Sequence, residues 1–364
     1  MTGICLQNTM ENKFEQTCNF AVQPKLSICI ATYNRSAFIA ETLDSILSQL
    51  AEGVEIVVVD GASPDNTQEV VAGYASRYPA LRYYREMENS GVDGDYDKAV
   101  SYATGEYCWL MTDDDLLRPG AVGRVLEKLD GGNDLVVVNA EIKNADFSVM
   151  LDEKLINIKF DREYRSGDEE SLFVETTQGL SFIGCVVIRR DVWLARDRKS
   201  YYGSLFVHVG VIFQHLPIAR AAVIAEPLIT IRYGNAMWTP RGLDIWIIKW
   251  PGLVWSFADF SDQAKSLVCP RGGWPLLKRL MFYRATGAYT IKAYDDILRT
   301  NISGLTRYAS KFVATVPVTL VSTIASIYCA VSGGRGARMI MNSLLSGGRA
   351  NFITRWAART VGII

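Results

Sequence analysis

Two patterns of apolar residues alternate along the first part of the chain. Short apolar runs between polar turns are typical of strands buried on both faces. Such runs lie at 26–31, 54–59, 81–84, 107–111 and 135–138. Between them, apolar residues recur every three or four positions, as at 38–50 and 122–129, which predicts helices. The alternation predicts an α/β fold with a largely parallel, Rossmann-like sheet.

Polar side chains gather where three of these strands end. They are Thr32, Tyr33, Asn34 and Arg35 after the first run, Asp60 after the second, and Asp113, Asp114 and Asp115 after the fourth. Alone, Asp60 or Arg35 would read as a helix cap or a surface charge. Because the carboxyl ends of parallel strands meet at one edge of a sheet, their common position predicts one ligand cleft.

The three consecutive carboxylates at 113–115 have two interpretations. Carboxylate oxygens are the ligands that Mg²⁺ and Mn²⁺ prefer, and a cation held there would also bind phosphates. The alternative is a solvated loop that caps a helix, because adjacent carboxylates repel one another unless solvated, protonated or metal-bound. No G-x-G-x-x-G or Walker A motif follows the first strand, which disfavours a dinucleotide fold and a P-loop.

Later segments extend the same domain. Residues 144–180 are charged and irregular, which predicts a solvated loop with a short helix, and acceptor selectivity would fit there. A further strand passes through Ile188, and 221–233 reads as the last strand.

Composition and cysteine usage fit a large globular protein in a reducing compartment. The chain has 364 residues and is 49% hydrophobic, enough for two domains. Its seven cysteines are scattered and show no C-x-x-C spacing, which disfavours a disulfide framework and a zinc site. The first 23 residues have no long apolar run and are expected to be a flexible leader.

Charge is distributed unevenly between the two halves of the chain. The net charge is −1, yet residues 263–364 contain 14 Lys or Arg and only two acids, a balance of +12. Such a segment is expected to meet an anionic surface, either lipid or nucleic acid. Five tryptophans lie between Trp238 and Trp274 among basic residues, which favours a membrane interface, although tryptophans also pack in cores.

A long uncharged segment also favours lipid over nucleic acid. No charge occurs from Phe312 to Gly334. Pro317 is expected to begin a helix there and Gly333 to end it, which leaves about 15 residues or roughly 22 Å. A bilayer core needs about 30 Å, so we expect monotopic insertion rather than a span. Beyond it, arginines alternate with apolar residues from Arg335 to Arg359, as in an amphipathic helix on anionic lipid.

The motifs at the strand ends resemble those of family 2 glycosyltransferases of GT-A fold. The resemblance covers roughly residues 24–235 and is greatest to the abequosyltransferase-like branch, which acts in O-antigen and surface polysaccharide biosynthesis. Its motifs are Ile-Ala-Thr-Tyr-Asn-Arg at 30–35, Val-Val-Asp-Gly-Ala-Ser at 58–63, Asn-Ser-Gly-Val-Asp at 89–93, Thr-Gly-Glu-Tyr at 104–107 and Asp-Asp-Asp-x-x-x-Pro at 113–119.

The resemblance implies roles for individual residues. Thr32, Tyr33, Arg35 and Asp60 would hold the base and ribose of a nucleotide-sugar donor, and Asp93 would line the same pocket. Asp113 would lie near the ribose and, with Asp114 and Asp115, at the Mn²⁺ or Mg²⁺ ion on the donor diphosphate. Residues 232–235 would close over the donor.

The chain departs from the family where a catalytic base is expected. Many members carry Glu-Asp on a helix after the metal motif, but the corresponding segment here, 203–210, has no acidic residue. His208 occupies about that place, and an imidazole acts as a base near neutral pH. A histidine among apolar residues is also often a core residue or a metal ligand. His215, Asp191, Asp93 and Asp95 are the other candidates for the base.

The resemblance implies an inverting, metal-dependent glycosyltransferase, for which we predict Asp115 and His208 as the catalytic residues. Its expected donor is a UDP-sugar, and its expected acceptor is a polyprenyl-diphosphate-linked saccharide. The GT-A domain would span 24–235, and a basic, Trp-rich helical region, 236–364, would attach it to the cytoplasmic face of the inner membrane. A non-catalytic scaffold and a sugar nucleotidyltransferase are the alternatives; the scaffold is favoured by the missing Glu-Asp pair.

Overall fold

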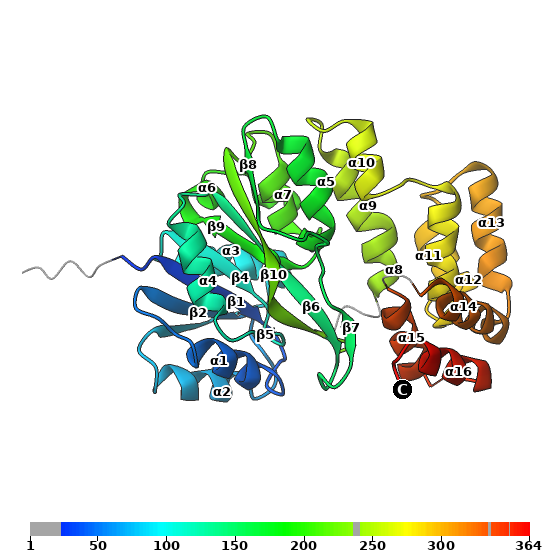
Figure 1. The fold of residues 1–364 in the computed structure, drawn as a ribbon, viewed down its shortest axis with the longest axis horizontal. Coiled ribbons are helices and arrows are strands. Elements are labelled where there is room, and N and C mark those ends of the chain that lie inside the picture. The colour runs from blue at the N-terminus through cyan, green and yellow to red at the C-terminus, as the bar shows by residue number, and fades with distance from the viewer. Residues whose placement is uncertain (1–22, 236–240, 334–335, 349) are drawn as a thin grey trace, which may run out of the picture.

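The computed structural model describes residues 23–235, 241–333, 336–348 and 350–364. The expected leader therefore lies outside the described residues except for Gln23, as do Trp238, Arg335 and Arg349. Figure 1 shows a sheet region covered by helices and, beside it, a region built of helices alone.

Ten strands of the described residues form one sheet in the order β3-β2-β1-β4-β9-β6-β10-β5, with β7 on β6 and β8 on β10. They are β1 (Leu26–Thr32), β2 (Val54–Asp60), β3 (Leu81–Arg85), β4 (Tyr107–Met111), β5 (Leu116–Leu117), β6 (Leu135–Asn144), β7 (Met150–Asp152), β8 (Arg162–Arg165), β9 (Val186–Arg189) and β10 (Arg220–Tyr233). The long pairings among β1, β2, β3 and β4 and between β6 and β10 are parallel, whereas β9 is antiparallel to both of its neighbours. The predicted α/β fold with a mostly parallel sheet is confirmed.

The central strands are covered on both faces. Every residue of β2 and of β4 is buried, and successive side chains of a strand point to opposite faces. Burial on both faces explains why these strands appear in the sequence as continuous apolar runs. The helices of this region are α1 (Ile39–Leu47), α2 (Thr67–Ala75), α3 (Gly91–Tyr102), α4 (Ala121–Leu129), α5 (Glu169–Leu180), α6 (Arg190–Leu194) and α7 (Val207–Phe213).

Two polar segments of this region form regular structure. The helix α3 begins at Gly91, whose N–H donates to Asn89 Oδ1 at 2.7 Å. Asp93 and Asp95 are therefore helical residues. Residues 144–180 hold β7, β8 and the 12-residue helix α5, so they are more regular than their charged composition indicated.

The second region consists of helices. They are α8 (Gly242–Asp244), α9 (Trp250–Ser256), α10 (Asp262–Val268), α11 (Gly273–Ala285), α12 (Ile291–Ala293), α13 (Gly304–Thr315), α14 (Val318–Ser332), α15 (Ala337–Ser346) and α16 (Phe352–Thr360), with π-helical segments at Ile245–Lys249 and Tyr294–Leu298. Pro317 precedes α14 and Gly333 ends it in the left-handed conformation, at φ 53°, as the sequence predicted.

The other expectations for this region fare differently. The alternating segment after Gly334 forms two helices, α15 and α16, and not one amphipathic helix. Trp250 is buried, and it packs with Trp246 against Phe206 of the sheet region, so these two tryptophans are packing residues. No single helix within the described ranges is long and apolar enough to cross a membrane; α13 and α14 pass that test only as a pair, bent by 104°.

Side chains of β6 and β7 join the two regions. Ile142 and Leu151 are buried in one cluster with Val321, Met341 and Leu344 of the helices. Hydrogen bonds reinforce the contact: Tyr233 Oη lies 3.0 Å from Ser343 Oγ, and Arg338 Nη1 donates to Met150 O at 3.3 Å.

Candidate active site

The acidic loop lies between the ends of two parallel strands. Met111 at the end of β4 pairs with Ile30 of β1, so Asp113 and Asp114 follow β4 where Arg35 follows β1. The hydroxyl of Tyr96 on α3 donates to Met111 O at 3.0 Å and anchors the start of the loop. The predicted convergence of segments about 80 residues apart is therefore present in the fold.

One arginine balances two of the carboxylates. Arg35 Nε lies 3.5 Å from Asp113 Oδ1, and Arg35 Nη2 lies 3.4 Å from Asp114 Oδ2. All three side chains are buried. A buried charge is costly without a partner, so the arginine and the two aspartates depend on one another.

Burial raises the pKa values of all three carboxyls in this loop. Burial and the neighbouring Asp114 charge raise the pKa of Asp113 to about 7, against the opposing effect of Arg35. Burial likewise raises the pKa of Asp114 and, together with the Asp114 charge, that of Asp115. An added cation would relieve this repulsion.

Asp115 is turned toward other partners. Its Oδ1 accepts the backbone N–H of Arg232 at 2.6 Å, and its Oδ2 accepts the Thr112 hydroxyl. Its backbone carbonyl accepts Thr42 Oγ1 at 2.9 Å. Asp115 thus ties the acidic loop to β10 and α1.

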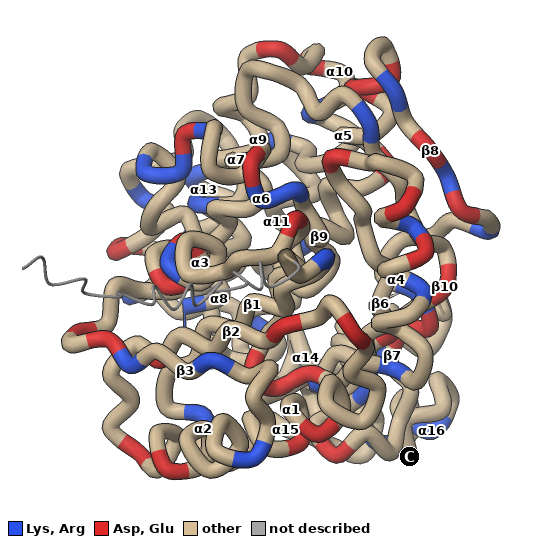
Figure 2. The backbone as a smooth tube through the Cα atoms, turned by 90° about the vertical axis from the view of Figure 1, so that its left-hand side faces the viewer, with Lys and Arg blue, Asp and Glu red and all other residues tan. Residues whose placement is uncertain are grey.

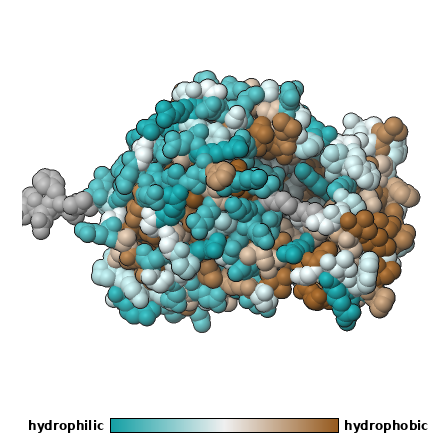
Figure 3. All heavy atoms as spheres, viewed as in Figure 1, coloured by the Kyte–Doolittle hydropathy of each residue, from teal (hydrophilic) through white to brown (hydrophobic). Residues whose placement is uncertain are grey.

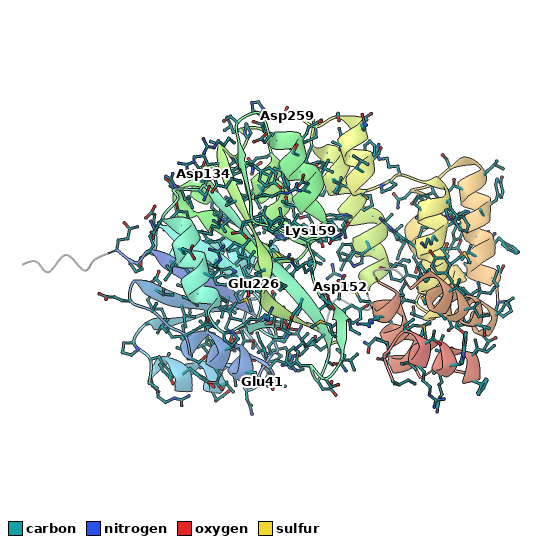
Figure 4. The ribbon with its side chains drawn as sticks, viewed as in Figure 1. Glu41, Asp134, Asp152, Lys159, Glu226 and Asp259 are labelled. Carbon is teal, nitrogen blue, oxygen red and sulfur yellow. The ribbon has the colours of Figure 1, made fainter. Side chains whose placement is uncertain are left out.

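The end of β10 covers the loop. Arg232 donates from Nε to Asp114 O at 3.0 Å and from Nη1 to Ala145 O at 2.8 Å, and it pairs with Glu41 of α1, whose place beside the sheet is labelled in Figure 4. Asn235 Nδ2 donates to Asp114 Oδ2 at 3.0 Å, and its carbonyl accepts Arg35 Nη1 at 3.3 Å. The segment 232–235 therefore lies on the residues that were predicted to hold the donor diphosphate.

The donor set suits a hard cation held together with phosphate. Among the described residues, no three His, Cys, Asp or Glu side chains surround one point as a metal site. Mg²⁺ and similar ions, however, are often held by one or two carboxylates plus substrate phosphates and water. Asp113 and Asp114 supply two carboxylates, and Asn235 Oδ1 beside them is buried without a hydrogen-bond partner among the described residues. These residues fit such a cation.

Asp60 and its neighbours form a second polar cluster. Asp60 is 0% exposed and accepts Tyr83 Oη at 2.6 Å, Arg85 Nη1 at 3.0 Å and the backbone N–H of Ser63 at 2.7 Å. Sequence reasoning missed Tyr83 and Arg85. Tyr83 and Arg85 are two positions apart in the third strand, so their side chains point to the same face of the sheet. Arg85 is the strand-register partner of Asp60. This spacing was the sequence signal that could have placed both residues beside Asp60.

Thr32 and Tyr33 lie next to the loop with different exposure. The Thr32 hydroxyl is buried near Asp113 and lowers the pKa of that carboxyl. Tyr33 is exposed, so its ring is accessible to a ligand. The assignments of both residues to the donor remain predictions.

Asp93 holds a backbone segment. Its Oδ2 accepts the N–H groups of Gly203 and Leu205 at 2.8 and 2.9 Å, and its Oδ1 accepts that of Val207 at 3.0 Å. One turn later, Asp97 accepts Trp193 Nε1 at 2.8 Å and pairs with Arg198 at 2.7 Å. One acidic face of α3 thus fixes the segment before α7, where the family resemblance led us to expect a Glu-Asp pair.

The two histidines have different surroundings. His208 on α7 is 1% exposed, its Nε2 lies 2.6 Å from Leu180 O, and burial lowers its pKa to about 4. Since a carbonyl only accepts, Nε2 carries the proton and Nδ1 is the free, buried nitrogen. His215 is exposed, with Nδ1 2.9 Å from Asp259. Among the described residues, no hydrogen bond or ion pair joins either histidine to the acidic loop.

A separate hollow is lined by residues around His215. Its volume is about 450 Å³, and Glu169, Glu170, Asp259 and Phe260 contribute to its walls. Figure 4 places Asp259 at the opposite end of the sheet region from Glu41, which pairs with Arg232 at the acidic loop. The hollow and the acidic loop are therefore distinct sites.

Comparison with known proteins defines the class. Residues 27–194, which are less than half of the chain, match the model of glycosyl transferase family 2. The predicted resemblance to this family is confirmed for that segment.

Individual relatives share low sequence identity with this chain. The chain is 25% identical over 230 residues to the abequosyltransferase RfbV of Salmonella typhimurium, a match covering 60% of this chain and 69% of that protein. It is 30% identical over 110 residues to a GalNAc(5)-diNAcBac-PP-undecaprenol beta-1,3-glucosyltransferase of Campylobacter jejuni, covering 30% of this chain and 36% of that protein.

Solved structures support the fold. The S. aureus TarS fragment 1–349 in complex with UDP-GlcNAc aligns with a TM-score of 0.50 and 17% identity, covering 92% of each chain. Another TarS structure aligns with a TM-score of 0.54 and 15% identity, covering 89% of this chain and 54% of that one. At these identities the likeness concerns the fold alone.

Proposed function

We propose that this protein is an inverting glycosyltransferase that moves one sugar from a UDP-sugar onto a lipid-linked saccharide. The observation that carries the proposal is the cluster of Asp113, Asp114, Arg35 and Asn235 at the strand ends of a family 2 domain. The diphosphate of a nucleotide-sugar needs a cationic site. Asp113 and Asp114 would hold a divalent cation there, and the cation would offset the charge of the diphosphate.

Each residue around the acidic loop has a separate role in this proposal. Asp113 and Asp114 would hold Mn²⁺ or Mg²⁺, which supplies Lewis-acid stabilisation of the departing diphosphate. Arg35 offsets the charge of the two carboxylates, and Arg232 fixes the loop through Asp115 and Asp114 O. Asn235 orients Asp114 through its side-chain amide.

The acceptor class and the catalytic base are proposed from other observations. The C. jejuni relative is named for a lipid-linked saccharide and the TarS fragment was solved with UDP-GlcNAc, which supports this donor and acceptor class. In a single displacement the acceptor hydroxyl attacks the anomeric carbon and loses its proton to a base. His208 was the predicted base, and it would have to be uncovered to act, because its free Nδ1 is buried. The carboxylates of 93, 95 and 191 stay as alternatives.

A non-catalytic scaffold remains the second candidate. The observation that favours it is the absence of an acidic pair at 203–210, combined with the burial of His208. The acidic loop opposes it, because a scaffold gains nothing from three buried carboxylates with raised pKa values.

Nucleotide binding by the purified chain tests the proposal. We expect UDP and Mn²⁺ together to raise the melting temperature more than GDP or dTDP with Mn²⁺, and Asp114→Asn to abolish the rise. Asp130→Asn, a change at an exposed aspartate after α4, is the matched control and should respond as wild type.

Transfer of labelled sugar from the responding donor to a polyprenyl-diphosphate saccharide then distinguishes enzyme from scaffold. Turnover that falls at least a hundredfold in Asp114→Asn supports the enzyme. If no nucleotide at millimolar concentration raises the melting temperature of folded wild-type protein, the result contradicts the proposal and favours the scaffold.

A further inference from the structure

The outward face of α14 is apolar although it faces solvent. α14 has no charged residue. Its inner stripe, which includes Val321, Ala325 and Cys329, is buried against the other helices. Its outer stripe, spaced as on one side of a helix, is exposed and consists of Leu320, Ile324, Ile327, Tyr328 and Val331, the last being 80% exposed. A helix that is apolar all round is normally buried on all sides.

The exposed stripe belongs to a larger surface. Trp274 of α11 is 66% exposed and lines, with Ile324 and Tyr328, a groove of about 190 Å³ between α11 and α14. Figure 3 shows the apolar residues of this side gathered over α14 and α15. We call the outer stripe of α14 together with Trp274 the apolar face. Contiguous apolar surface of this kind marks an interaction site.

Taken together, five helices of this region, including the two that form the apolar face, carry charge of one sign. The helices α11, α13, α14, α15 and α16 contain no Asp or Glu, but they carry Lys278, Arg279, Arg284, Arg307, Lys311, Arg338, Arg355 and Arg359. None of these cations lies within ion-pair distance of a carboxylate among the described residues. Acidic segments run instead over elements of the sheet region such as α1, α3 and β8 (Figure 2).

One of these cations lies in the groove itself. Lys278 lines the groove, where its Nζ donates to Tyr328 Oη at 2.7 Å and lies 4.7 Å from the centre of the Tyr328 ring. A lysine that stretches along an apolar surface and keeps its ammonium at the rim suits a layer whose interior is hydrocarbon and whose surface is anionic.

We propose that the apolar face docks onto the surface of an anionic lipid bilayer, with the groove between α11 and α14 receiving hydrocarbon. A second copy of the chain fits less well, because a two-fold contact through this face would bring two cationic surfaces together. The proposal is independent of the donor chemistry, and it is tested without donor or acceptor.

Vesicle flotation of the full chain is the test. We expect wild-type protein to float with vesicles of phosphatidylcholine and phosphatidylglycerol and to bind pure phosphatidylcholine at least tenfold more weakly. Ile324→Glu combined with Val331→Glu should lower binding to the anionic vesicles at least tenfold. Lys278→Glu should lower it severalfold, and that loss should shrink in high salt.

A matched control keeps the result specific. Met87→Glu places the same charge at a 98% exposed apolar residue of the sheet region and should bind vesicles as wild type does. Circular dichroism and melting temperature must show that each variant is folded.

Two outcomes would overturn the proposal. One is the absence of wild-type binding to either vesicle, or unchanged binding by the folded double variant. The other is a wild-type dimer in sedimentation velocity without lipid that the double variant dissociates, which would assign the face to a second copy.

Discussion

At the scale of single residues, His208 is the clearest case of a side chain with two interpretations. Its Nε2 proton is committed to Leu180 O, and its burial holds the pKa at about 4. A neutral imidazole is chemically able to accept a proton, but Nδ1 is enclosed. A packing role and a catalytic role for His208 therefore predict different results when this residue is substituted.

We predict that His208→Gln retains folding and most activity, because the glutamine amide replaces Nε2–H as donor to Leu180 O. His208→Leu leaves that carbonyl unpaired and should lose about 1–3 kcal/mol of unfolding free energy. Urea titration and steady-state turnover check both variants. A loss of kcat of a hundredfold or more in His208→Gln, at unchanged stability, would instead identify His208 as the base.

The same residue predicts a pH dependence of stability. The folded-state pKa of about 4 lies below the ordinary 6.5, so the unfolded chain binds the extra proton between these values and acid favours unfolding. From pH 7.5 to 5, wild type should lose about 2 kcal/mol more than His208→Gln. Urea midpoints of the two proteins at both pH values provide the measurement, and equal losses would contradict the low pKa.

Residue roles were predictable where the sequence places chemistry at strand ends. Arg35 and the acidic loop meet as expected, because parallel strands bring their ends together. Asp93 gave no such signal: its three backbone donors come from a segment more than 100 residues later. Tertiary hydrogen bonds of this kind have no local pattern in the sequence.

At the scale of elements, α3 acts as an anchor for a distant loop. Asp93 and Asp97 lie one turn apart and bind, respectively, the backbone at 203–207 and the side chains of Trp193 and Arg198. The segment 203–207 is thereby held by hydrogen bonds from another helix.

We predict that Asp93→Asn loosens this segment. An asparagine has one acceptor oxygen, and its NH₂ group faces backbone donors, so about 1–3 kcal/mol of stability should be lost. Hydrogen exchange at 203–213 should rise more than elsewhere, and Asp130→Asn serves as control. Unchanged exchange combined with a raised KM for the donor would restore the role of Asp93 as a donor-pocket residue.

The two ends of α14 could be predicted from residues that begin or end helices. Pro317 and Gly333 bound α14 as predicted, since each has a fixed local effect on the backbone. The division of the following segment into α15 and α16 was not predicted. Ala337, Met341, Ala357 and Ala358 are buried in one cluster, so the two helices fold back upon shared partners, a tertiary effect that apolar periodicity does not encode.

At the scale of the whole molecule, the sheet region and the helices share a buried cluster. Ile142 of β6 and Leu151 of β7 contribute to the same cluster as Val321 and Met341. Because each region covers apolar side chains of the other, we expect the two to unfold in one cooperative transition.

Leu151→Asp should break that cooperativity. A carboxylate at this buried position lacks a partner and should cost about 3 kcal/mol or more. Differential scanning calorimetry should then resolve two transitions where wild type has one. Leu267→Asp, at an exposed leucine of α10, should leave the single transition intact, and two transitions in wild type would contradict the shared core.

Arg232 connects the acidic loop to the contact between the two regions. Its guanidinium bonds Asp114 O and Ala145 O and lies 4.1 Å from the centre of the Phe147 ring, so one side chain spans the acidic loop and the connection between β6 and β7. The strand β7 in turn packs against α15 through Leu151 and Arg338. A continuous set of contacts thus leads from Arg232 to α15, which shares a buried cluster with α14 of the apolar face. If nucleotide binding changes the affinity for a surface through these contacts, linkage requires that the surface change the affinity for the nucleotide by the same factor.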